Sequence, residues 1–205
     1  MKRNLVLQKF NDELLYSSDL KRYMVGLPWK SDVLRQELQN NIYVAEKRLK
    51  NLHKRTLDPD DKLREEYYDT FNEYLAEGIA EIVPPEEIET SNPTYYLPHH
   101  PVVKKDAVSS RVRPVFDASA KSANGKSLND LLETGPSLNP DLVAVLIRFR
   151  RWPISLSGDV RKAFLQIYMK SIDRDVHRFL LLFNGTIVHC RFTRIPLEIK
   201  AHHFC

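Results

Sequence analysis

The sequence contains little cysteine and no long apolar run. Cys190 and Cys205 are the two cysteines among its 205 residues, which is too few for a framework of disulfides and fits a reducing compartment. No stretch approaches the roughly eighteen apolar residues that a membrane-spanning helix needs. The N-terminal stretch MKRNLVLQKFNDELL turns polar after three apolar residues, so it lacks the apolar core of a signal peptide. We therefore expect an intracellular, cytoplasmic protein without a membrane span.

The overall composition is that of a soluble, globular chain. Hydrophobic residues make up 42%, aromatic residues 10%, and the mean hydropathy is -0.42. The net charge of +4 conceals an asymmetry: residues 1–100 contain 14 Lys and Arg against 18 Asp and Glu, whereas residues 101–205 contain 17 against 9. The positive second part favours phosphate-bearing partners, because each cation that meets a phosphate releases condensed counterions. A solvated basic surface is the alternative that charge alone leaves open.

The first part of the chain has the apolar spacing of helices. Apolar residues recur at steps of three and four over residues 31–52, which predicts one long helix. A second helix is predicted over residues 58–78, where Asp-Pro supplies the cap and first position, and antiparallel packing is the simplest arrangement. The acidic residues predict solvated faces. The proline-rich stretch 82–94 ends the pattern, so we expect a helical N-terminal connector over residues 1–92 and a second domain over residues 93–205.

After this stretch the sequence predicts a β-hairpin. Two β-rich runs, around Val102-Val103 and over residues 112–116, are separated by the polar link DAVSS. Pro114 in the second run predicts an edge strand or a bulge, since proline cannot donate to a neighbouring strand. Four cations gather near the expected tip: Lys104, Lys105, Arg111 and Arg113.

A third helix is predicted to start at Asn139-Pro140 and to end before Trp152-Pro153. Arginines near its end complement the negative end of the helix dipole, and they could equally contact nucleic acid. The expected apolar face consists of Leu142, Val145, Leu146 and Phe149, and the arginines are Arg148, Arg150 and Arg151.

Two further β-segments follow. Residues 154–159 alternate between apolar and polar and predict a strand whose polar face ends in Asp159. Residues 178–192 contain two β-runs joined by Asn184-Gly185, a dipeptide that suits a type I′ turn, and predict a second hairpin. Considered alone, Asp159 is more often a turn or capping residue than a metal ligand.

Five stretches occur in an order that resembles one protein family. They are RYMVGLPWK (22–30), YYLPHHPVVKKD (95–106), RVRPVFDASAKSANGKSLND (111–130), GDVRKAF (158–164) and FTRIP (192–196). Together they resemble the reverse transcriptase region of Bel-Pao class LTR retrotransposon polyproteins. The resemblance implies an α+β fold with the fingers and an incomplete palm of a right-hand polymerase, preceded by the helical connector. It also implies RNA-directed DNA polymerisation on an RNA or DNA template-primer, with deoxynucleoside triphosphates (dNTPs) and Mg²⁺.

The resemblance assigns roles to individual residues. Asp159 and the backbone carbonyl of Val160 match the groups that hold Mg²⁺, which makes Asp159 the catalytic carboxylate. Phe164 matches the aromatic side chain that contacts the sugar and excludes a 2′-hydroxyl; a plain core aromatic is the alternative. The basic hairpin that grips the incoming triphosphate is matched by Lys104, Lys105 and Arg113. A solvated basic loop is the alternative for these cations.

Three other polar residues lie in matched stretches. Asp117 and Asn129 are expected to have structural or template-positioning roles, and Gln166 fits a plain surface strand better than a contact with the template or the nucleotide. These positions are therefore secondary to the assignments above.

The family pattern continues with a hairpin that bears paired aspartates, and these 205 residues contain no such hairpin. Asp173 and Asp175 predict a solvated turn rather than a replacement. After Pro196 the stretch LEIKAHHFC departs from the family pattern, so we expect a truncated copy that is inactive alone. Two other functions stay open, namely a non-catalytic nucleic-acid-binding remnant and a transposon-derived interaction module that acts through the helical half.

Overall fold

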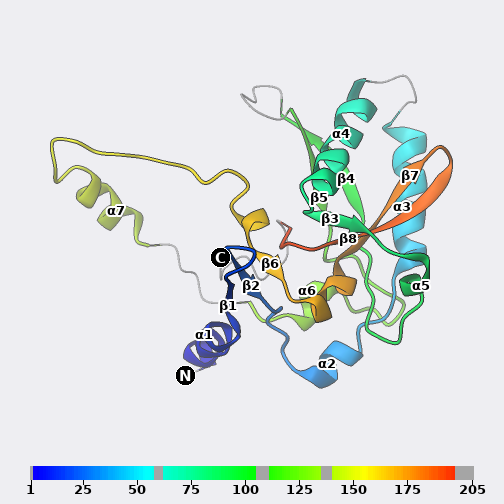
Figure 1. Cartoon of the computed structure of the whole chain (residues 1–205), viewed down its shortest axis with the longest axis horizontal. Helices are drawn as coiled ribbons and strands as arrows, with labels where there is room; N and C mark the ends of the chain where they lie inside the picture. Colours follow the sequence, from blue (N-terminus) through cyan, green and yellow to red (C-terminus); the bar gives the residue numbers. More distant parts are fainter. Residues whose placement is uncertain (1, 58–61, 105–110, 135–139, 197–205) are drawn as a thin grey trace.

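Helices and strands alternate along the chain, and the strands of its described residues form three small sheets (Figure 1). The computed structural model describes residues 2–57, 62–104, 111–134 and 140–196. Their mixture of helices and separate, mostly antiparallel strands confirms the α+β class. Within these ranges, no helix is both long enough and apolar enough to cross a membrane.

The largest hairpin is the one predicted over residues 178–192. Strands β7 (Arg178–Phe183) and β8 (Thr186–Phe192) pair antiparallel. Asn184 and Gly185 join them with φ values of 48° and 81°, the left-handed conformation that a type I′ turn requires at both positions. Strand β3 (Ala80–Ile82) pairs with the other edge of β8. This sheet therefore combines a strand from before residue 92 with two strands from after it. The domain boundary at residue 92 stays a prediction.

The hairpin predicted around Val102-Val103 and residues 112–116 is also confirmed. Strands β4 (His99–Val103) and β5 (Val112–Phe116) pair antiparallel and form a sheet of two strands, with Pro101 opposite Pro114. Both strands are edges, which is where proline is tolerated. Val112 and Phe116 are buried while Arg113 between them is exposed, as alternation along a strand requires.

The third sheet joins the beginning of the chain to its later part. Strands β1 (Leu15–Ser17) and β2 (Arg22–Val25) form a hairpin, and β2 pairs in parallel with β6 (Tyr168–Met169). This sheet was not predicted, because such short strands carry little periodic signal. The remaining elements are α1 (Lys2–Glu13), α5 (Pro85–Ile88), α6 (Leu128–Leu131), and the 3-10 helices η1 (Phe164–Gln166) and η2 (Ser171–His177).

The single helix predicted over residues 31–52 is wrong. The structure has a short helix α2 (Asp32–Gln36) and a separate helix α3 (Ile42–Arg55). Asn41 explains the break, because its side-chain amide donates to the carbonyl of Tyr96 at 2.8 Å and accepts from the Tyr96 N–H at 2.7 Å. The neighbouring Asn40 accepts from the Ile42 N–H at 2.8 Å through its side chain, a local bond that competes with a continuous helix.

Helix α4 (Lys62–Ala76) confirms the second predicted helix over its described part. Residues 58–61, where the cap was predicted, lie outside the described residues. Helices α3 and α4 run in opposite directions (Figure 1), as expected, and they meet where the Tyr68 hydroxyl lies 2.8 Å from His53 Nε2. Helix α4 packs on β5 and β3, whereas α3 packs on β7 and β4. The helices of the first half therefore cover the sheets of the second half.

The core between these layers is rich in aromatic rings. Phe71 of α4 is fully buried and stacks on Phe179 at 5.5 Å between ring centroids, and Phe116 meets Phe192 edge-on at 4.9 Å. His99 lies among them, with its Nδ1 2.6 Å from the Tyr67 hydroxyl and its Nε2 2.7 Å from the Leu180 carbonyl oxygen. Burial lowers the pKa of His99 to about 4, so the imidazole is neutral at pH 7.

The helix predicted from residue 139 exists, but it does not pack. Helix α7 (Leu142–Phe149) begins after Asp141, whose side chain accepts from the Val143 N–H at 2.9 Å; Asn139 lies outside the described residues. We call residues 140–161 the arm, because they extend away from the rest of the chain (Figure 1). Leu142 is 70% exposed and Ile147 66%, so the predicted burial of an apolar face is wrong.

The strand predicted over residues 154–159 is also wrong. These residues have no regular secondary structure, and Ile154 and Leu156 are 80% and 90% exposed. Alternation marks a segment that is able to pair, but a strand exists only where a partner supplies the other half of the ladder. None of the three described sheets includes this segment.

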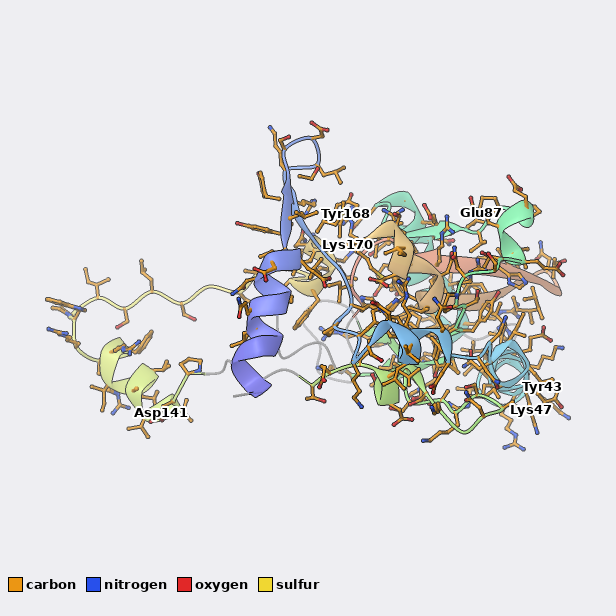
Figure 2. All side chains as sticks on the ribbon, turned by 90° about the horizontal axis from the view of Figure 1, so that it is seen from below. Tyr43, Lys47, Glu87, Asp141, Tyr168 and Lys170 are labelled. Atoms are coloured by element: carbon orange, nitrogen blue, oxygen red, sulfur yellow. The ribbon has the colours of Figure 1, made fainter. Side chains whose placement is uncertain are left out.

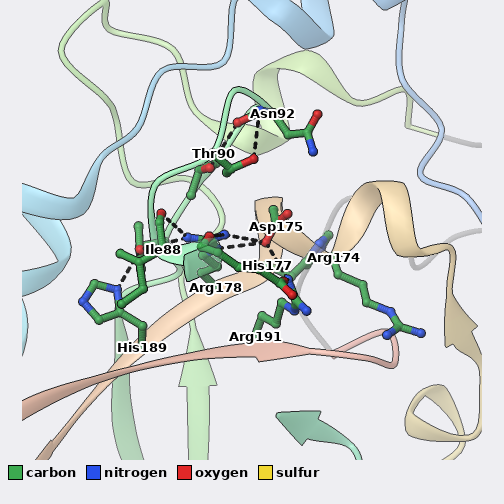
Figure 3. A network of polar contacts seen from close by, with 12 residues as sticks. Ile88, Thr90, Asn92, Arg174, Asp175, His177, Arg178, His189 and Arg191 are labelled. Atoms are coloured by element: carbon green, nitrogen blue, oxygen red, sulfur yellow. Dashed lines mark hydrogen bonds and ion pairs between the residues drawn. The ribbon is translucent and has the colours of Figure 1, made fainter. Parts of the chain in front are cut away.

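The solvated turn predicted at Asp173 and Asp175 is wrong as well. Asp173 is 3% exposed and accepts hydrogen bonds from the Leu27 N–H and the Trp29 Nε1–H, each at 2.9 Å. Asp175 accepts from the fully buried Arg178 at 2.9 Å and 2.7 Å, as Figure 3 shows. Both carboxylates therefore hold the fold together.

Arg178 and Arg191 extend this network to the residues around α5. Arg178 also donates to the carbonyl oxygens of Ile88 at 2.8 Å and Glu87 at 2.6 Å. Arg191 donates to the carboxylates of Glu81 and Glu87, each at 2.6 Å. A buried guanidinium needs such complete pairing, because an unpaired charge in the interior is strongly destabilising.

Candidate nucleic-acid interface

The β4–β5 hairpin presents two of the predicted cations to solvent. Lys104 follows β4, and its N–H donates to the Arg111 carbonyl at 2.9 Å, which continues the ladder toward the tip. Lys104 and Arg113 are both exposed, and within the described ranges neither forms an ion pair. Arg111 differs, because its Nε donates to the Glu66 carboxylate at 2.9 Å. Lys105 lies outside the described residues.

Tyr74 of α4 connects this hairpin to the segment after Asp159. Burial, assisted by the charges of Glu73 and Glu77, raises the pKa of Tyr74 to about 12, and the nearby charge of Arg113 opposes that rise. On the other side, the Lys162 ammonium lies 5.8 Å from the centre of the Tyr74 ring. Arg113 and Lys162 therefore approach the same residue at the C-terminal end of α4.

Lys162 holds the turn that follows Asp159. Its φ is 52°, a left-handed conformation that costs a residue with a Cβ about 1 kcal/mol. The side chain compensates, since its Nζ lies 3.1 Å from each carboxylate oxygen of Glu77 and 3.6 Å from Glu73. Cations are favourable at a helix C-terminus. The turn is thus fixed to the end of α4, three residues after the predicted catalytic carboxylate.

Asp159 itself lies in the exposed, irregular end of the arm, and Val160 is 65% exposed. Within the described ranges no hydrogen bond or ion pair joins Asp159 to Lys104 or Arg113. No group of three or more His, Cys, Asp or Glu side chains suited to a metal ion occurs in that part of the chain either. A pair of divalent ions needs carboxylates from several segments, so the donors present do not fit a resident Mg²⁺ centre. The roles of Asp159 and Val160 stay predictions.

Phe164 begins η1 and is half-buried. Its carbonyl accepts from the Ile167 N–H at 3.1 Å, and the next residue, Leu165, is buried. Gln166 bonds through its side-chain oxygen to Arg22 and through its Nε2 to the Arg161 carbonyl at 3.1 Å. Gln166 therefore lies in a 3-10 helix rather than in the predicted strand, and the contact of Phe164 with a sugar stays a prediction.

Two polar residues of the stretch FTRIP that were not predicted to have a role bond to the residues at the end of α4. Arg194 donates to the Glu77 carbonyl at 2.8 Å and to the Leu165 carbonyl at 3.3 Å. Thr193 donates from its hydroxyl to the Gly78 carbonyl at 2.7 Å. The bonds to Glu77 and Gly78 satisfy carbonyls just after the end of α4, and the bond to Leu165 joins the same place to η1. Membership in a matched stretch was the one signal that could have pointed to them.

Asp117 and Asn129 have structural partners. Asp117 forms an ion pair with Arg48 of α3 at 2.6 Å and accepts from the Ser119 N–H at 2.9 Å. Asn129 donates to the Ser119 hydroxyl at 3.0 Å. These contacts shape the loop after β5 and link it to α3.

Comparison with known proteins gives a limited result. No protein-family model matches the sequence, and no curated protein matches it. Among solved structures, the chain is similar to the protease-reverse transcriptase of prototype foamy virus, crystallised as a selenomethionine-labelled CSH mutant, with a TM-score of 0.48 and 17% identity. The match covers 69% of this chain and 16% of the viral chain.

Proposed function

We propose that this chain is the fingers and the first part of the palm of an RNA-directed DNA polymerase from a Bel-Pao class retrotransposon. By itself, it binds a template-primer and does not transfer nucleotides. The ordered stretches of sequence support the family. The observation that supports the binding function best is the hairpin on which Lys104 and Arg113 are exposed and, among the residues that the structure describes, have no acidic partner.

In this proposal each cation has a defined task. Arg113 presents a planar fork of donors that suits phosphate oxygens, and Lys104 presents a point charge. Both bind phosphates of the template-primer or of a dNTP at the hairpin. The ion pair between Lys162 and Glu77 fixes the turn after Asp159 to the end of α4. Phe164 follows that turn and would lie against the sugar. Asp159 supplies one carboxylate, fewer than two Mg²⁺ ions require, so binding without chemistry is expected.

Fluorescence anisotropy with a labelled, primed RNA template tests the binding function. We expect binding that weakens steeply with salt, and a double variant Lys104→Gln/Arg113→Gln whose slope of log K against log salt is smaller by about 2. The control is Lys47→Gln/Lys54→Gln, which removes two exposed cations from α3 and should leave the slope unchanged. A flat salt response of the unmodified chain contradicts the proposal.

Primer extension with Mg²⁺ and dNTPs tests the absence of chemistry. We expect no incorporation above background by the chain alone. Incorporation that Asp159→Asn abolishes would show a working metal centre and overturn this part of the proposal.

A further inference from the structure

The end of α7 and the residues after it combine arginines with exposed aromatic rings. Residues 148–152 read Arg-Phe-Arg-Arg-Trp, and we call them the arginine-aromatic segment. Phe149 is 48% exposed and Trp152 67%. The guanidinium of Arg151 lies 5.5 Å from the centre of the Trp152 ring, which is a favourable cation-π distance.

This segment has no counter-charge in the described part of the chain. Its three arginines are exposed, and none of them forms an ion pair there. Figure 2 shows α7, marked by Asp141, at the end of the molecule opposite Tyr43 and Lys47 of α3. Three cations within four positions therefore have no carboxylate paired with them in the described ranges.

We propose that the arginine-aromatic segment binds single-stranded nucleic acid. This inference rests on the proposed function and adds a second contact surface to the β4–β5 hairpin. The arginines meet backbone phosphates, and Phe149 and Trp152 stack on unpaired bases, which expose the ring faces that a duplex keeps stacked internally. A partner protein would cover the apolar residues of the arm, but the excess of arginine over carboxylate favours a polyanion.

Tryptophan fluorescence gives a direct readout, because the two tryptophans differ in exposure. Trp29 is 6% exposed and Trp152 67%, so stacking of a base should quench Trp152 selectively. Titration with single-stranded oligo(dT) should quench the emission of the unmodified chain. Trp152→Leu should abolish this quenching and weaken binding, measured by anisotropy, by about fivefold or more. The matched control is Tyr43→Leu, since Tyr43 is 76% exposed on α3, and this variant should bind normally.

The charges are tested by replacing all three arginines of the segment with glutamine. The slope of log K against log salt should fall by about 2, because each phosphate contact on a single strand contributes about 0.7. The control replaces Lys47, Lys54 and Arg55, which are exposed on α3, and so removes the same charge elsewhere. Circular dichroism confirms folding, and no loss is expected because the arm is not part of the core.

The outcomes separate this inference from the proposed function. If the unmodified chain binds no nucleic acid, both are overturned. If it binds and both arm variants bind equally well, the arm inference is wrong and the hairpin function stands. If light scattering shows a dimer that Trp152→Leu converts to a monomer while the affinity for oligo(dT) is unchanged, the arm is a dimer interface. In that case the inference is overturned.

Discussion

Two buried histidines should make this protein sensitive to mild acid. His99 and His177 are 7% and 0% exposed, and burial lowers the pKa of each to about 4, from an ordinary value of 6.5. Because the folded-state pKa lies below that of the unfolded chain, stability is complete above pH 6.5 and is lost as the pH falls toward 4. A difference of about 2.5 pH units corresponds to about 3 kcal/mol for each histidine.

The two losses together approach the whole stability of an ordinary domain, which is about 5–15 kcal/mol. His99 and His177 together should decrease the free energy of unfolding by up to about 2.7 kcal/mol for each pH unit in the middle of this range, and His53 and His189, whose pKa values burial also lowers, act in the same direction. Urea titrations followed by far-ultraviolet circular dichroism between pH 8 and pH 4.5 measure that slope. The pKa of Asp130 is lowered to about 2, mainly by the Ser127 hydroxyl. Its contribution to stability is therefore lost only below pH 4.5, outside the measured range.

A variant assigns the effect to His99. In His99→Gln the amide nitrogen replaces Nε2 as donor to the Leu180 carbonyl, but it does not titrate. The slope should fall by up to about 1.4 kcal/mol for each pH unit, with a lower stability at pH 8 because the Tyr67 hydroxyl loses its partner. His100→Gln, at the exposed neighbouring position, should keep the full slope. A free energy of unfolding that is independent of pH between 7 and 5, or a wild-type slope in His99→Gln, would refute the assignment of this effect to buried histidines.

Three further substitutions test the contacts described above. Asn41→Ala should reduce the free energy of unfolding by about 2–4 kcal/mol, because two buried backbone groups of Tyr96 lose their partner; a loss below 1 kcal/mol in urea would contradict this. Lys162→Ala should cost about 1 kcal/mol and Lys162→Gly less, since glycine adopts a positive φ freely; equal losses would show that the backbone is unstrained. Asp175→Asn should destabilise by about 3–5 kcal/mol, because the buried Arg178 loses its carboxylate; a melting temperature within a degree of the wild type would argue against that pairing.

The sequence predicted those elements whose cause is local. Asn184 and Gly185 have the conformations of a tight turn whatever surrounds them, and the apolar spacing of α4 is a property of that helix alone. The break before α3 was missed because it depends on Asn41 meeting Tyr96, 55 residues later. The burial of Asp173 was missed for the same reason, since its donors come from residues 146 and 144 positions earlier.

The candidate interface also combines features with a local cause and features that depend on distant contacts. Arg113 is exposed next to the buried Val112 of β5, as alternation along a strand requires, whereas Val102, Val103 and Lys104 are all exposed and show no alternation. The junction of Lys162 with the end of α4 depends on a contact across 85 positions and has no local signal. The strand that ends at Asp159 was predicted from the alternation of apolar and polar residues. Alternation shows which side chains share a face, but it does not show whether another strand is available for pairing.

The pairing of β3 with β8 has a consequence for the order in which the chain folds. Ala80 lies opposite Phe192, so this ladder closes a loop of more than a hundred residues, and such distant contacts slow folding. During synthesis, α4 and β3 emerge long before Phe179 and Phe192, the rings that cover Phe71. Until then the inner face of α4 is open to water. A polypeptide cut before Phe192 would keep that apolar face open and should be captured by chaperones or aggregate.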